Sequence, residues 1–387
     1  MKSSARHVLV VMHRWVGYLQ GVQLGIANYF LQRPNWIWTQ VTPLSQLISE
    51  ISKIDADGVI AYVEQPYLAA LKRLHKPVVD ISNWISVAPF PRVLADDRAI
   101  GRLAARYLRD LGLRHFGTGG PFKAEFARLR CEGFAEALAE DGFSVDRIGA
   151  RKPVVPKGLS IPPGVNRDVF IWLRQAPKRM GLFALTDDFA AQALNACRSA
   201  GVRTPEDVCV LGVDNDELIT KVSNPPLSSI ALPTQKIGFE AARLLDNLMS
   251  GGRPPRSPLL FPPVGVVARQ STDLFAIADN DVQAAVRYIR ERVAERLTVK
   301  DLLDQIPVNR RYLERKFKLH IGRTPLQEIR RMRLEKAKEL LSHTDMAMPA
   351  IARQSGFQNA ARLANVFHAL VGQTPTAFRH RFRLGET

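Results

Sequence analysis

The sequence predicts an α/β domain with parallel sheets at residues 1–275 and an all-α domain at residues 276–387. Three observations support this division. Short β-branched runs alternate with amphipathic helical patterns up to about residue 270, an order typical of parallel βαβ units. Strand signals end near Asp281, and a 50-residue repeat follows. A chain of 387 residues that is 46% hydrophobic is long enough for two or three cores.

The α/β domain is expected to alternate strands and helices along the chain. The clearest strands are 8–12, 58–62, 77–81, 181–185 and 208–213, and the clearest helices are 17–31, 99–111, 128–140, 189–200 and 234–249. The segment 251–263 is dense in Gly and Pro, and Pro at such density cannot continue a central strand or helix. We therefore place the domain boundary after it, near residue 275.

The tail is expected to be helical and to repeat itself. Its helices are predicted at 281–294, 298–304, 308–320, 324–342, 347–354, 359–370 and 374–383. One copy of the repeat has Asn309, Leu313, Phe317, Gly322, Thr324 and Pro325, and the other has Asn359, Leu363, Phe367, Gly372, Thr374 and Pro375. Two copies of one helical unit are therefore joined by the helix 324–342.

Each copy of the repeat has the order of elements expected of a helix-turn-helix. A short helix ends in a tight turn, and an asparagine, Asn309 or Asn359, then opens a second helix. The Asn side chain can accept a hydrogen bond from the unpaired backbone N–H groups of the first helical turn. The Leu and Phe of each copy are four residues apart and turn one face inward. Gly322 and Gly372 suit the left-handed conformation that ends a helix.

The net charge of +17 is unevenly placed. Residues 281–387 hold 21 Lys or Arg against 11 Asp or Glu. The candidate DNA-binding residues of the first copy are Asn309, Arg310, Arg311, Arg315 and Lys316. Arg suits phosphate and guanine contacts, and side chains early in such a helix meet base edges in the major groove. Double-stranded DNA is the expected partner, and the alternative is a basic helix that only solvates its polar face.

Over its last hundred or so residues the sequence resembles the AraC/XylS family of transcriptional regulators. The matching stretches are 309–317, 331–341, 351–357 and 367–375. The resemblance implies one DNA-binding domain whose two recognition helices enter successive major grooves, roughly 34 Å apart. A linker helix of about 18 residues spans roughly 27 Å at 1.5 Å per residue, which agrees with that separation.

The second helix departs from the family pattern. Arg362 and Leu363 replace an aromatic pair, and Asn365 and His368 stand where the family usually has basic residues. Because these basic residues are missing, we expect the second helix to hold phosphates more weakly. Its expected base readers are Gln358, Asn359, Arg362 and Asn365. The first motif also departs from the family pattern, since Leu303 takes the place of a small Ala.

The α/β domain resembles the LacI and periplasmic sugar-binding group. The resembling stretches are 130–134, 186–191, 211–215 and 226–230. They imply a two-lobed, periplasmic-binding-protein-like sensor of a small sugar. Such a sensor joined to an AraC-like tail is the arrangement of the xylose operon regulators, which implies a pentose such as xylose as the effector.

The expected effector-binding residues are His13, Arg130, Asp187 and Asp214. His13, Asp187 and Asp214 directly follow three predicted strands. In open parallel sheets, ligands bind outside the carboxyl ends of the strands. Carboxylates and an Arg can make charge-assisted hydrogen bonds to sugar hydroxyls.

The same residues also have structural interpretations, which stay open at this stage. Asp187 could cap the following helix, Asp214 could start a turn, and Arg130 could be a solvated helix residue. Trp15 or Trp84 could stack on the apolar face of a sugar.

Composition argues against several other classes of protein. The three cysteines are far apart and have no metal-ligand spacing, which argues against disulfides and a zinc site. The apolar run 8–12 is about half of a usual signal region, and the sequence has no run of roughly 18 apolar residues that a membrane span needs. The usual phosphate-loop, dinucleotide, HExxH and nucleophile-elbow motifs are missing. We expect a cytoplasmic protein that is not an enzyme, with no metal, no cofactor and no membrane partner.

The leading hypothesis is a ligand-gated regulator. A sugar closes the sensor, changes the arrangement of a homodimer, and so alters how two tails meet paired operator half-sites. RNA polymerase is a further expected partner if the outcome is activation. The alternatives are a carbohydrate-binding or transport protein, and a carbohydrate enzyme fused to a DNA-binding tail. Paired carboxylates in a deep cleft would favour the enzyme.

Overall fold

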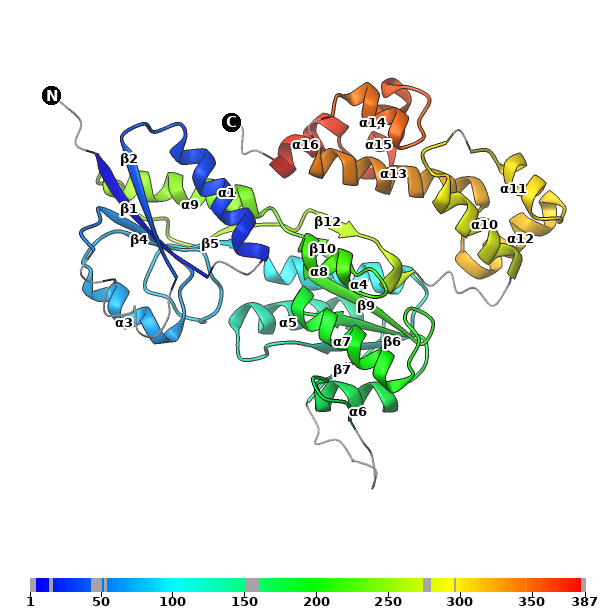
Figure 1. Cartoon of the computed structure of the whole chain (residues 1–387), viewed down its shortest axis with the longest axis horizontal. Helices are drawn as coiled ribbons and strands as arrows, with labels where there is room; N and C mark the ends of the chain where they lie inside the picture. Colours follow the sequence, from blue (N-terminus) through cyan, green and yellow to red (C-terminus); the bar gives the residue numbers. More distant parts are fainter. Residues whose placement is uncertain are drawn as a thin grey trace.

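The computed structural model describes residues 5–13, 17–42, 51, 54–149, 161–273, 280–295, 297–344 and 346–383. Two α/β lobes come first, and a tail whose described residues are largely helical follows (Figure 1). The predicted order of an α/β domain and a helical domain is confirmed. In the described part of the chain, we find no helix with both the length and the hydropathy that crossing a bilayer requires.

The first lobe is built on a parallel sheet in the order β2-β1-β3-β4. Its strands are β1 (Arg6–Val11), β2 (Trp36–Val41), β3 (Gly58–Ala61) and β4 (Val78–Asp80), and its helices are α1 (Gly17–Phe30), α3 (Gln65–Arg73) and α9 (Thr234–Met249). Helices α1 and α9 pack against each other (Figure 1). The central strand β1 is buried on both faces from Val8 to Val11, which explains its unbroken apolar sequence.

The second lobe has a larger sheet in the order β12-β10-β9-β8-β6-β7. Its strands are β6 (His115–Gly119), β7 (Val145–Arg147), β8 (Met180–Ala184), β9 (Val208–Asp214), β10 (Ser228–Ala231) and β12 (Gly265–Val267). Its helices are α4 (Asp97–Asp110), α5 (Glu125–Ala139), α6 (Arg167–Gln175), α7 (Asp187–Ala200), α8 (Glu217–Val222) and the short 3₁₀ helix η1 (Gln270–Thr272). The predicted parallel sheets are confirmed, and the second sheet adds one antiparallel edge strand, β12, which pairs with β10.

Three chain segments connect the lobes: 81–96, 232–233 and 250–264. The first and third contain β5 (Val93–Ala95) and β11 (Leu259–Phe261), which pair in parallel as a separate two-stranded sheet. The strand β11 lies inside the Pro-rich segment, where we expected no central strand. It occupies three residues between prolines in a two-stranded ribbon, a position that Pro tolerates better than the interior of a large sheet.

The tail consists of two small cores that share one long helix. Its helices are α10 (Asn280–Glu291), α11 (Val299–Gln305), α12 (Arg310–Ile321), α13 (Pro325–His343), α14 (Met348–Gln354), α15 (Ala360–Val371) and α16 (Pro375–Arg383). Helix α13 contributes Ile329 to the first core, with Leu313 and Phe317. It contributes Leu341 to the second core, which includes Leu363 and Phe367. The predicted repeat therefore corresponds to two structural units joined by α13.

Candidate functional site

The first candidate site lies where the strands of both lobes end. His13 follows β1, and its Nε2 lies 3.4 Å from Oε2 of Glu64, which follows β3. The ring of Tyr62 packs edge-on to the His13 ring. Tyr18 donates its hydroxyl to the carbonyl of Ile81, just past β4. Burial raises the pKa of Tyr18 and of Tyr62, so both hydroxyls keep their protons and can donate hydrogen bonds.

Arg130 is buried on α5, in the second lobe, and only 5% of it is exposed. Its Nε donates to Oδ1 of Asp97 at 2.9 Å, and its Nη1 donates to the carbonyl of Leu185, just past β8. Asn83, on the segment between the lobes, donates to Oδ2 of Asp97 at 2.8 Å. The interpretation of Arg130 as a solvated helix residue was therefore wrong. Burial raises the pKa of the Asp97 carboxyl, and the Arg130 cation opposes that shift.

Asp214 ends β9 in a strained conformation. Its φ is +109°, and that of Asn215 is +52°, values in the region that L-residues rarely adopt and that clusters at functional sites. Burial raises the pKa of Asp214 to about 7. The positive charge of Arg130 lowers this pKa, and the negative charges of neighbouring Asp residues raise it further. Tyr18, Tyr62 and Arg130 all interact electrostatically with this carboxyl. The two lobes thus bring polar groups together around Asp214.

Asp187 occupies a different position from the other predicted residues. It begins α7, but the N-cap is Thr186, whose hydroxyl accepts from the N–H of Phe189. The Asp187 carboxylate accepts from the Ser229 hydroxyl at 2.6 Å and from the N–H of Asp216 at 2.8 Å. Both oxygens are therefore engaged inside the second lobe, where they hold the loop that follows Asp214.

The entrance to α1 lies against the second lobe. A Cβ placed at Gly17 would lie 2.2 Å from Oδ2 of Asp216, so only a residue without a side chain fits this approach. Near Arg130, Trp84 packs on Phe126 of α5, with ring centroids 5.7 Å apart. The guanidinium of Arg130 lies over the same Phe126 ring. Trp15, the other aromatic candidate, lies outside the described residues.

Sequence reasoning missed Asn83 and Asp97. Both follow the same rule that selected His13 and Asp214, because Asn83 comes just after β4 and Asp97 just after β5. Asn83 lies two residues beyond the predicted strand 77–81, and the short strand β5 was not predicted. The pairing of Asp97 with Arg130, 33 residues away, is not encoded locally.

The second candidate site is the pair of helices that follow the turns in the tail. The side chains of Asn309 and Asn359 accept from the N–H groups of Tyr312 and Arg362, each at 2.8 Å. Gly322 and Gly372 end α12 and α15 with φ of +71° and +76°. The predicted N-caps and C-caps are confirmed.

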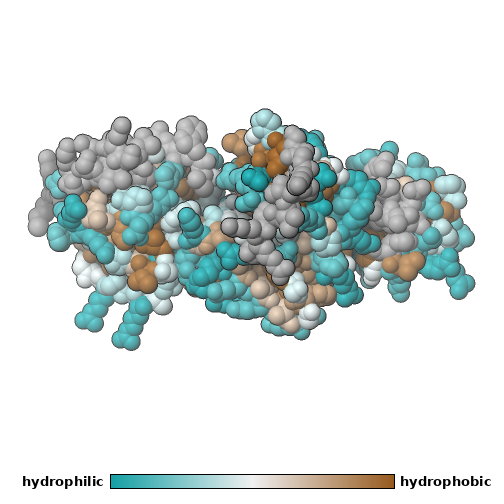
Figure 2. Space-filling view, turned by 90° about the horizontal axis from the view of Figure 1, so that it is seen from below, coloured by the Kyte–Doolittle hydropathy of each residue, from teal (hydrophilic) through white to brown (hydrophobic). Residues whose placement is uncertain are grey.

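The predicted contact residues lie on the outer faces of α12 and α15 and at their starts. Those exposed to solvent are Asn309, Arg310, Arg311, Arg315, Gln358, Asn359, Arg362 and Asn365, whereas Lys316 is half-buried. Arg310 pairs with Glu314 at 2.8 Å, and Lys316 lies over the Tyr312 ring. Hydrophilic residues border the end of the molecule where α11 and α12 lie (Figure 2). The first helix is the more basic of the two.

Comparisons with known proteins identify both parts of the chain. Residues 105–272 match the periplasmic binding protein-like domain, and residues 302–381 match a helix-turn-helix domain. The xylose operon regulatory protein of Escherichia coli (strain K12) is 30% identical over 86% of this chain and 86% of its own length. That of Haemophilus influenzae is 29% identical over 85% and 86%.

A solved structure has the same arrangement of domains. The xylose-binding transcription activator xylR aligns with a TM-score of 0.62 at 26% identity and covers 98% of this chain and 99% of its own. These similarities extend through the sensor, the linker and the tail, so the chain acts as a sugar-responsive, DNA-binding transcriptional regulator. It belongs to the family of xylose operon regulatory proteins.

Proposed function

We propose that this regulator senses D-xylose in the cleft between its two lobes. Arg130, Asp214 and His13 come from both lobes and offer charged or polar groups to sugar hydroxyls. The observation that carries the proposal is the convergence of buried Arg130 and half-buried Asp214 with the hydroxyls of Tyr18 and Tyr62. The names of the relatives support xylose as the sugar. Asp187 supports the loop of Asp214 from behind.

Two of the carboxylates near the proposed sugar site are engaged by internal donors, which favours binding over hydrolysis. Asp97 is held by Arg130 and Asn83, and Asp187 by Ser229 and the backbone of Asp216. A hydrolase needs two carboxylates that are available to flank the bond that is cut. Carboxylates already engaged by internal donors are suited to holding a pocket in shape.

Affinity for xylose is expected to rise with pH between about 5.5 and 8. Desolvation raises the pKa of Asp214 to about 7, so the apo protein holds a neutral acid there below pH 7. Sugar hydroxyls that donate to the carboxylate favour its ionised form, which makes binding weaker by up to about tenfold per pH unit below 7. Calorimetry at several pH values measures this, and Asp214→Asn should remove the slope. A wild-type affinity that rises toward low pH would contradict the role given to Asp214.

The contribution of Asp214 to the stability of the apo protein is expected to fall as the pH rises, whereas the affinity for xylose rises. The folded pKa of Asp214 is above its unfolded value, so the folded state binds the extra proton. The stabilisation from this group is present at low pH and is lost as the pH rises through about 7. Thermal melts of the apo protein and of Asp214→Asn, compared at pH 6 and pH 8, measure this difference.

We propose that the tail binds the operator with α12 and α15 in successive major grooves. Helix α13 has 19 residues and a length of about 28 Å at 1.5 Å per residue, close to one turn of DNA. Helix α12 would hold DNA more firmly than α15, because Arg310, Arg311 and Arg315 lie on its exposed face.

Arg311→Ala is expected to weaken operator binding by about 1–3 kcal/mol if its side chain meets a base. Arg311 is a sharper test than Arg310, which already pairs with Glu314. Wild-type affinity should also fall steeply with salt, with a slope of about −0.9 for each neutralised phosphate. Fluorescence anisotropy measures both effects. Arg198→Ala, which removes an exposed Arg of α7 in the second lobe, is the control and should leave binding unchanged; equal losses in both variants would contradict the assignment.

We further propose a homodimer in which xylose controls the spacing of the two tails, with RNA polymerase as a partner in activation. Residues 276–387 then form an independent reader, because the tail has its own two cores and an ordinary domain size. This fragment should bind a half-site without sugar. The full-length protein with xylose should bind a full site more tightly, because tethering two readers can raise the avidity by about 10²–10⁴. Fluorescence anisotropy on half-site and full-site duplexes measures these affinities. If the fragment binds the full site as tightly as the xylose-bound full-length protein does, control through dimer geometry is ruled out.

A further inference from the structure

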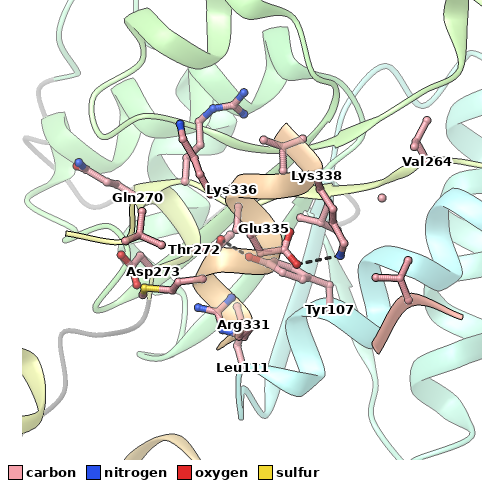
Figure 3. A pocket seen from close by; sticks show the side chains of 18 of the residues that line it. Tyr107, Leu111, Val264, Gln270, Thr272, Asp273, Arg331, Glu335, Lys336 and Lys338 are labelled. Carbon is pink, nitrogen blue, oxygen red and sulfur yellow. Dashed lines mark hydrogen bonds and ion pairs between the residues drawn. The ribbon is translucent and has the colours of Figure 1, made fainter. Parts of the chain in front are cut away.

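A cavity of about 580 Å³ lies between the second lobe and the tail. The sensor contributes Tyr107 of α4 and residues 264–270, 272 and 273 around β12 and η1, and the tail contributes Arg331 and Glu335 of α13 (Figure 3). The labelled side chains of Tyr107 and Thr272 meet at this cavity, close to α13. The linker helix of the DNA-binding tail therefore lies beside a polar group of the sensor.

A chain of hydrogen bonds leads from this hydroxyl into the second lobe. Tyr107 Oη lies 2.8 Å from Oγ1 of Thr272, and Thr272 donates to Oγ of Ser228 at 2.7 Å. Ser228 in turn donates to the carbonyl of Arg269 at 2.9 Å. A threonine hydroxyl has one proton, so Tyr107 must be the donor to Thr272. Burial raises the pKa of Tyr107 to about 12, which keeps that proton in place.

The chain continues to the cleft. The guanidinium of Arg269 donates to Oδ1 of Asn215 at 2.8 Å. Asn215 follows Asp214 directly and shares its left-handed backbone. The N–H of Asn215 donates to the Ser229 hydroxyl at 3.0 Å. The loop that follows Asp214 is therefore connected to Arg269 through the side chain of Asn215.

The tail side of the cavity carries charged side chains that are half-buried. Arg331 and Glu335 act electrostatically on the Tyr107 hydroxyl in opposite senses. Glu328, which is fully buried on α13, pairs with Arg331 at 2.6 Å and with Arg323 at 3.0 Å. The Tyr107 hydroxyl therefore interacts with charges on α13, one of which, Arg331, is anchored on the buried carboxylate of Glu328. Because α13 belongs to both cores of the tail, it connects this junction to both α12 and α15.

We propose that Tyr107 is a positioning residue that transmits the state of the sugar cleft to α13, through Thr272, Ser228, Arg269 and Asn215. This inference rests on the proposed control of operator binding by xylose. It assigns the junction between the second lobe and α13 as the surface through which the sensor acts on the reader. The internal chain borders the cavity at Tyr107, Thr272 and Arg269, and Tyr107 is the member of the chain whose hydroxyl interacts electrostatically with Arg331 and Glu335 of the tail.

The test is Tyr107→Phe, which removes one hydroxyl and keeps the ring. D-xylose affinity, measured by calorimetry, should equal that of the wild type. The change in operator affinity that xylose causes, measured by anisotropy, should shrink by about two- to thirtyfold. Thr272→Val should give the same loss, and the double variant should lose no more than either single variant, because both changes break one chain.

The matched control is Tyr29→Phe, which removes a hydroxyl that donates to Asp246 at 2.6 Å in the first lobe. It should keep the full response. A Tyr107→Phe variant with the wild-type response, or with weakened xylose binding, would overturn this inference, and so would additive losses in the double variant. A wild-type protein that binds no xylose would instead overturn the proposed function.

Discussion

Replacing Arg130 by Met is expected to abolish xylose binding and to destabilise the sensor by about 3–5 kcal/mol, because it leaves the buried carboxylate of Asp97 without its cation. Arg130 is 5% exposed and Asp97 is 4% exposed, so water cannot replace the lost partner. The carbonyl of Leu185 loses its donor as well. Urea unfolding measures the stability, and calorimetry measures the binding of D-xylose.

A second substitution separates the two roles of Arg130. Adding Asp97→Asn to Arg130→Met removes the uncompensated charge, so part of the lost stability should return. Xylose binding should stay absent if the guanidinium contacts the sugar. Recovery of binding together with stability would mean that Arg130 only maintains the fold. The control is Arg128→Ala on the same helix, whose side chain forms surface ion pairs with Glu125 and Glu132 and should affect neither measurement.

Phe367→Ala is expected to destabilise the second half of the tail by about 3–5 kcal/mol. Phe367 is fully buried, and its ring packs edge-on to Phe378 with centroids 5.2 Å apart. The first half keeps its own core around Phe317. Recognition through α12 should therefore survive while recognition through α15 is lost.

The measurement is operator binding with base changes in one groove or the other. The operator affinity of Phe367→Ala should no longer depend on the bases in the groove that α15 enters. It should still depend on the bases in the groove that α12 enters. Leu370→Ala, at a position on α15 that is 59% exposed, is the control and should resemble the wild type. Simultaneous loss of both sensitivities would mean that the two halves of the tail fold as one cooperative unit.

The tail was predictable in detail because its signals are local. An Asn cap, a Leu and Phe four residues apart and a C-terminal Gly all act within one helix, so the bounds of α12 and α15 follow from adjacent residues. The 50-residue repeat doubled each signal. The position of α13 as a shared element followed from the same repeat, since a helix between two copies has one copy on each side.

The group of polar residues around Asp214 was predictable in part. Strand ends selected His13, Asp187 and Asp214, because parallel strands carry their ligands at one edge. The inward orientation of Asp187 was not predictable, since its partner Ser229 is 42 residues away. The pairing of Asp97 with Arg130 was also not predictable, because an Asp in the first turn of a helix is common without any such partner.

The sequence by itself determined the fold class, the order of the two domains, the caps of both recognition helices and the basic face of α12. These features depend on periodicity and on neighbours within a few residues. The tertiary structure alone decided that Arg130 is buried against Asp97, that β12 closes the second sheet in antiparallel fashion, and that Tyr107 meets Thr272 across 165 residues. Each of these depends on how distant segments approach one another in space, and no spacing along the chain records that approach.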